Sequence, residues 1–161
     1  MTYALAVFSY AYDIVEAAAV LLFSGPTNDD GDYERYMAAF QKLDQKVANR
    51  DSPIGFLIID PNNALPNALW RKRFAEAGMS LKSNPTLIVV SASALARGVV
   101  RAIQWVRPMP LQAFTASDFG EAMGIAEQRR GRAIRGLLAL EAEARDAAAA
   151  RGRAMTRANS A

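Results

Sequence analysis

Three short apolar runs, each followed or preceded by a segment with helical periodicity, limit this chain to a small set of architectures. The runs at 54–59 (IGFLII) and 85–91 (PTLIVVS) are nearly continuous in apolar residues, and a shorter one occupies 111–115 (LQAFT). Continuous apolar runs of this length are typical of strands that are covered on both faces of a sheet. Because strands that alternate with helices form largely parallel sheets, the chain is expected to be an α/β protein.

Amphipathic helices are expected between these runs. Apolar residues recur at spacings of three and four in three segments, which are 33–47, 67–77 and 94–106. Asp30 or Asp32 is expected to cap the first of these helices. Leu69 and Leu95 fall on the apolar stripes of the second and third helices, so both side chains are expected to face the core.

The N-terminal part of the chain adds two further strands. Residues 3–12 (YALAVFSYAY) alternate loosely, and residues 19–24 (AVLLFS) form an apolar run that is closed by Gly25. We expect the two segments to pair as an antiparallel edge of the sheet. The predicted fold is therefore a mixed, mostly parallel sheet of four to five strands with about four helices and a C-terminal helical extension.

The composition of the chain changes at Gln128. Residues 1–127 carry the strand and helix patterns, whereas residues 128–161 consist mostly of Ala, Arg and Glu. The extension has too few large aliphatic residues to form a core of its own, and it is expected to be frayed from about Ala147. Its dense basic run has no interleaved aromatic residues, so nucleic acid is not expected as a partner.

The 161 residues contain no histidine and no cysteine. This removes the side chain that titrates near neutrality, the thiol nucleophile and the commonest transition-metal ligands. We therefore assign no catalytic residue, no metal site and no cofactor, and we expect a binding protein instead of an enzyme. The net charge of +3 is too small and too dispersed to indicate a polyanionic partner.

The apolar N-terminal segment does not have the form of a targeting signal. Its first basic residue is Arg35, and Asp13 and Glu16 interrupt the apolar run. A signal peptide or an inserted membrane helix is therefore not expected. Together with the absence of cysteine, this predicts a cytoplasmic protein.

Polar residues follow the runs at 54–59 and 85–91, where parallel α/β sheets bind their ligands. These residues are Asp60, Asn62, Asn63, Asn67, Ser91, Ser93 and Arg97. A protein partner or an anionic group could contact them and the adjacent helix starts. The alternative is that the Asn and Pro residues only build turns and caps, and that Arg97 belongs to a solvated helix face with Arg101 and Arg107.

Three aromatic residues at helical spacings define a second candidate site. Trp70, Phe74 and Trp105 could line an apolar pocket between the helices and the sheet, which would hold a small hydrophobic, lipid-like ligand. The alternative is that these side chains are ordinary core residues. A second copy of the chain is a further expected partner, through the N-terminal edge strand or the C-terminal extension, because an uncovered edge strand tends to pair.

Four segments carry a resemblance to a known family. They read FSGPT at 23–27, FLIID at 56–60, PTLIVVSAS at 85–93 and LQAFTASDFGEAM at 111–123. The order of these segments and the turn residues between them resemble the STAS domain, and more closely its SpoIIAA-like (STAS-like) branch. The resemblance implies a non-enzymatic domain that docks partner proteins in regulatory signalling, and its STAS-like branch is associated with small apolar ligands.

The chain departs from this family at the position of its switch. Some members are regulated by phosphorylation of a Ser at the start of the helix that follows the central strand. No Ser or Thr occurs between Pro53 and Gly78, and Asn62, Asn63 and Asn67 stand there instead. Regulation by that route is therefore not expected.

A degenerate receiver-like signalling domain is the third function considered. FLIIDP and VVSAS resemble the strand that ends in a phosphate-accepting Asp and the next strand, which ends in a hydroxyl residue; Asp60 and Ser91 occupy these places. A receiver also has a Lys after its fifth strand, whereas the segment after the last strand here, TASDF, has none. The receiver interpretation therefore ranks below the other two.

Overall fold

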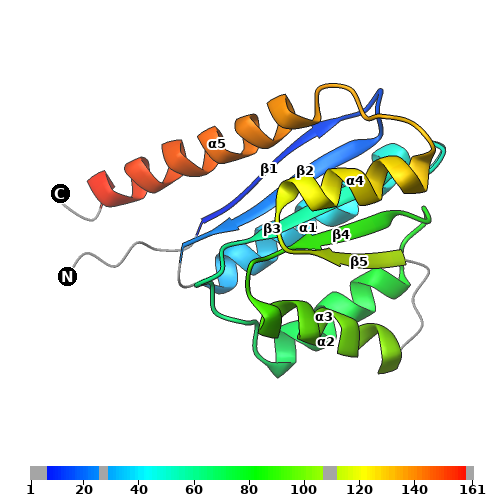
Figure 1. Ribbon diagram of the computed structural model, residues 1–161. Helices are drawn as coiled ribbons and strands as arrows, with labels where there is room; N and C mark the ends of the chain where they lie inside the picture. The colour runs from blue at the N-terminus through cyan, green and yellow to red at the C-terminus, as the bar shows by residue number, and fades with distance from the viewer. Residues whose placement is uncertain (1–6, 26–28, 107–111, 159–161) are drawn as a thin grey trace.

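One five-stranded sheet organises the protein (Figure 1). The computed structural model describes residues 7–25, 29–106 and 112–158, without the side chains of 103–106. The strands, which neighbour one another in sequence order, are β1 (Val7–Asp13), β2 (Ala18–Ser24), β3 (Ile54–Ile59), β4 (Thr86–Val90) and β5 (Gln112–Ala116). β1 is antiparallel to β2, and all other pairs are parallel. The predicted α/β fold with an antiparallel N-terminal pair is confirmed.

Helices cover both faces of this sheet. They are α1 (Asp30–Val47), α2 (Ala68–Met79), α3 (Ala94–Val106), α4 (Phe119–Arg130) and α5 (Leu137–Ala158). The helices α1, α2 and α3 lie on one face of the sheet, and α4 and α5 lie on the other (Figure 1). The central strand β3 is thereby enclosed, which explains why its sequence is continuously apolar.

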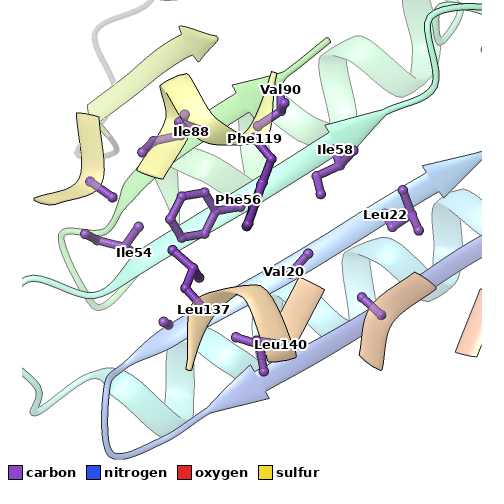
Figure 2. Close-up of a cluster of buried hydrophobic side chains, with 14 of the residues drawn as sticks. Val20, Leu22, Ile54, Phe56, Ile58, Ile88, Val90, Phe119, Leu137 and Leu140 are labelled. Carbon is purple, nitrogen blue, oxygen red and sulfur yellow. The ribbon is translucent and has the colours of Figure 1, made fainter. Parts of the chain in front are cut away.

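The larger core lies between the sheet and the helices α4 and α5. Phe56 of β3 is fully buried there, and its ring centroid lies 5.3 Å from that of Phe119 in α4. Figure 2 shows Leu137 of α5 directed towards Phe56 and Val20. Residues 54, 56 and 58 all point to this face because side chains alternate along a strand.

The opposite face is rich in aromatic residues from β1, β2, α1 and α2. Phe8, Tyr33, Tyr36 and Trp70 are all less than a tenth exposed. Burial raises the pKa of the Tyr36 hydroxyl, because the phenolate could not be solvated there. These rings fix the position of α1 and α2 relative to the N-terminal strands.

The start of α1 differs from the expectation that Asp30 or Asp32 caps it. Asp29 is the N-cap residue, and its carboxylate accepts a hydrogen bond of 2.7 Å from the Asp32 N–H. The carboxylate of Asp32 is buried and accepts the Phe8 N–H, while Asp30 accepts the Trp70 indole N–H. The helix thus begins at Asp30, three residues before the apolar pattern that starts at Tyr33, and its two acidic side chains bind other elements.

The C-terminal segment forms one helix, in which Ala148 is the last buried residue that the structure describes, so little is buried beyond Ala147, from where fraying was expected. α5 continues to Ala158 and contacts β1 and β2, with Leu137, Leu140, Ala144 and Ala148 buried. The Ser9 hydroxyl of β1 donates a hydrogen bond of 2.7 Å to the Ala144 carbonyl. The alanines have little apolar area each, but their small size lets the helix backbone approach the sheet closely.

Candidate functional site

The carboxyl ends of the parallel strands and the starts of the helices that follow them share one edge of the sheet. All seven polar residues selected from the sequence lie on this carboxyl edge, between the end of β3 and the first turn of α3. They form two groups. One group follows β3 and the other follows β4.

The first group joins the turn after β3 to the turn after β2. Asp60 accepts the Asn62 N–H at 2.9 Å and the Gly25 N–H at 3.3 Å through its two carboxylate oxygens. The Asn63 side-chain amide donates to the Gly25 carbonyl at 2.9 Å. Asn67 caps α2 by accepting the Trp70 N–H at 3.0 Å. These side chains therefore fix the backbone of the edge, and Asn62 is exposed on it.

The second group builds the turn between β4 and α3. The buried Ser91 hydroxyl accepts the Ser93 N–H at 3.2 Å, and the Ser93 hydroxyl accepts the Ala96 N–H at 3.3 Å. The Arg97 guanidinium reaches back to the Ser91 carbonyl at 2.5 Å. The structure thus brings Ser91 and Arg97 into direct contact through this hydrogen bond.

A third part of the edge, after β5, was not selected from the sequence. The Glu121 carboxylate accepts both the N–H and the hydroxyl of Ser117, each at 2.7 Å. These hydrogen bonds, together with the charges of Arg97 and Arg101, hold the pKa of Glu121 below its usual value. The sequence signal was available: Asp118 caps α4, and a capping residue followed three positions later by Glu is typical of a helix start.

Two exposed leucines lie beside these polar groups. Leu69 in the first turn of α2 is 63% exposed, and Leu95 in the first turn of α3 is 69% exposed. The prediction that both face the core is wrong. Their neighbours Trp70 and Ala96, in the same first turns, are buried, so Leu69 and Leu95 lie on the outward side of these turns.

The three aromatic residues of the second candidate site have different surroundings. Trp70 is 3% exposed, and its ring centroid lies 5.1 Å from that of Tyr33. Phe74 lines a cavity of about 120 Å³ between α1, α2, α3 and the sheet. The side chain of Trp105 lies outside the described residues. The cavity walls are otherwise mostly apolar and include Tyr36, Phe40, Leu57, Leu87, Val89 and Val100.

Within the described ranges, no group of three or more acidic side chains is arranged to hold a metal ion. None of the helices described combines the length and hydrophobicity that a membrane span requires. Comparison of the chain with family models, with curated proteins and with solved structures finds no significant match.

Proposed function

We propose that this chain is a non-enzymatic, STAS-like protein-interaction module that acts in regulation in the cytoplasm and docks its partner at the carboxyl edge of the sheet. The observation that carries the proposal is the exposure of Leu69 and Leu95 in the first turns of α2 and α3. Protein interfaces obtain most of their affinity from a few apolar anchors surrounded by polar residues. At this edge, Asn62 and Ser93 supply that polar surrounding.

The hydrogen bonds of the edge support the same proposal. Asp60, Asn63 and Asn67 hold the turn after β2, the turn after β3 and the start of α2 in one conformation. A surface that is already ordered loses little conformational entropy when it binds, which favours affinity. Both carboxylate oxygens of Asp60 are also occupied by backbone N–H groups, so this side chain acts as a brace within the edge.

The arrangement of elements agrees with the resemblance on which the STAS-like assignment rests. Three strands alternate with helices after an antiparallel pair. The position of the family's phosphorylated Ser falls in the stretch that contains Asn62, Asn63 and Asn67, where the chain has amide side chains. We therefore assign the docking to constitutive apolar contact, without a phosphate switch.

The test is to remove the apolar anchors and leave the fold intact. The double variant Leu69→Ser/Leu95→Ser changes two exposed side chains, so the free energy of unfolding should change by no more than about 0.5 kcal/mol per site. Leu138→Ser is the matched control, because Leu138 is 62% exposed on α5, on the other face of the sheet. Proteins captured from the native cell by the wild-type chain and by the control should be lost with the double variant. Identical captured proteins for all three chains would refute the docking edge.

A small apolar ligand is the second candidate function, and the cavity lined by Phe74 favours it. Its volume of about 120 Å³ is close to that of a core cavity that binds benzene, and it is well below the roughly 300 Å³ that a drug-sized ligand needs. A ligand would therefore be a single ring or a short chain, not a fatty acid. Thermal unfolding with benzene and with laurate distinguishes a small ligand from a fatty acid. A rise in Tm with benzene alone supports a small apolar ligand in this cavity. No rise in Tm with either compound refutes ligand binding there.

A further inference from the structure

The outer edge of β1 lies at the bottom of a groove. β1 is the first strand of the sheet, with α5 beside it on one face and α1 on the other (Figure 1). The groove has a volume of about 480 Å³; its floor is formed by residues 8–10, and its walls by Arg35 and Lys42 of α1 and Ala147 and Arg151 of α5. It is the largest hollow among the described pockets, and it lies away from the carboxyl edge that forms the proposed docking surface.

The backbone of β1 presents hydrogen-bonding groups to this groove. The Phe8 N–H donates to the Asp32 carboxylate at 3.1 Å, so the backbone of Phe8 points away from β2. In an antiparallel pair, alternate residues direct both their N–H and their C=O to the same side. Tyr10 and Tyr12 therefore also direct their backbone groups away from β2. The α1 helix satisfies the first of these positions through Asp32 and leaves the next positions for another strand.

The charge of the groove is of one sign. Among the described residues that line it, Arg35, Lys42 and Arg151 are cationic and none is acidic. Arg35 is offset by ion pairs with Asp29 and Asp32. Lys42 and Arg151 have no carboxylate within ion-pair distance in the part of the chain that the structure describes. Two uncompensated cations, one on each wall, therefore flank the open edge of the strand.

We propose that β1 binds an extended, acidic segment of a partner protein, which adds to the sheet as a sixth strand. Strand addition supplies backbone hydrogen bonds, and the side chains of the added strand alternate between the two walls. Acidic side chains on both faces of the segment then meet Lys42 on one wall and Arg151 on the other. A second copy of this chain is a poorer occupant, because two such edges would bring the same cations together. The inference goes beyond the proposed function because it concerns a different surface.

The probe is a fluorescein-labelled peptide as long as β1, seven residues, made of Val, Thr and Glu with Glu on both faces of the strand. The matched control peptide has Lys in place of every Glu. Fluorescence anisotropy with the full chain should give saturable binding of the acidic peptide only. Lys42→Glu/Arg151→Glu should weaken binding by at least roughly tenfold, since each reversal replaces an attraction by a repulsion. Lys72→Glu, which changes an exposed cation on α2, should leave it unchanged.

A second pair of variants separates strand addition from simple charge attraction. Tyr10→Ala removes the ring and keeps the backbone N–H, whereas Tyr10→Pro removes both; proline is tolerated at this position because the N–H faces the open edge. Circular dichroism establishes that both variants are folded. The proline variant should bind the acidic peptide markedly more weakly than the alanine variant.

Several outcomes overturn the proposal. These are equal binding of the acidic and basic peptides, equal affinity of the two Tyr10 variants, and no binding of the acidic peptide by the wild-type chain. A concentration-dependent dimer in sedimentation that the Tyr10→Pro variant abolishes would assign the edge to a second copy instead. Loss of the partner through Leu69→Ser/Leu95→Ser does not affect any of these measurements, so the two surfaces are tested separately.

Discussion

Replacing Arg130 with alanine is expected to destabilise the protein strongly, although this side chain belongs to none of the described hydrophobic clusters. Arg130 ends α4, and its side chain is only 6% exposed. It donates hydrogen bonds to the carbonyls of Glu16 at 2.5 Å, Ala17 at 3.4 Å and Ser52 at 2.9 Å, and it lies 3.5 Å from the Glu16 carboxylate. One guanidinium thus ties the β1–β2 turn and the segment before β3 to α4.

The magnitude follows from these contacts. Ala17 and Ser52 have φ values of 47° and 49°, in the left-handed region that costs a non-glycine residue about 1 kcal/mol or more, so their carbonyls stay in place only while something holds them. Burial lowers the pKa of Arg130, with a contribution from the charge of Arg132, whereas Glu16 raises it. The guanidinium is therefore costly to bury, but its removal takes a donor from three carbonyls, and at about 1 kcal/mol for each hydrogen bond the free energy of unfolding falls by about 3 kcal/mol.

The assay is urea unfolding followed by circular dichroism, with thermal unfolding alongside. A loss of about 3 kcal/mol lowers Tm by roughly 6–12 °C in a domain of this size. Arg132→Ala is the control, because Arg132 pairs with the same Glu16 at 2.7 Å but is 54% exposed, and it should cost at most about 1 kcal/mol. Arg130→Lys should be intermediate, since an ammonium cannot reproduce the planar fork of donors. Equal losses for Arg130→Ala and Arg132→Ala would refute this reasoning.

Three further predictions concern stability. Burial alone would raise the pKa of Asp44, but hydrogen bonds from Lys82 and Ser83 outweigh it and hold that pKa below its usual value. The stability that Asp44 contributes is therefore complete above about pH 4 and is lost as the pH falls further. In Asp44→Asn, the free energy of unfolding measured in urea should fall less steeply over this acidic range. Leu137→Ala should cost about 2–4 kcal/mol in chemical denaturation, because it opens a cavity beneath α5. Gly131→Ala should cost about 1 kcal/mol by thermal unfolding, because Gly131 ends α4 with a φ of 73°.

The central strands were predictable from the sequence because burial on both faces leaves a continuous apolar run. β3 occupies 54–59 in both the prediction and the structure, and β4 lies within the predicted 85–91. The exposure of Leu69 and Leu95 was not predictable from periodicity, since adjacent apolar residues at a helix start do not indicate which one faces outward, and here Trp70 and Ala96 are the buried ones. The course of α5 was also missed, because its contact with the sheet depends on close approach by alanines and not on large apolar residues.

The candidate site was predictable in part for the same kind of reason. The rule that polar loops gather beyond the carboxyl ends of parallel strands placed Asp60 and Ser91 on one edge. The groove beside β1 could not be found in this way. Tyr10, Lys42 and Arg151 all line this groove. Lys42 and Arg151 are more than a hundred residues apart in the sequence, and they face the same groove because α5 returns to the first strand.

The return of α5 to β1 has a consequence for biosynthesis. The hydrogen bond between Ser9 and Ala144 joins residues 135 positions apart, and Leu137 and Leu140 close a core that also contains Val20 and Leu22 of β2. The apolar face of the nascent β1–β2 hairpin therefore stays uncovered until α5 has been synthesised and has left the ribosome, since long-range contacts can form only after both partners are synthesised. Premature termination before residue 137 would release a product whose exposed sheet face makes it a client for chaperones and proteases.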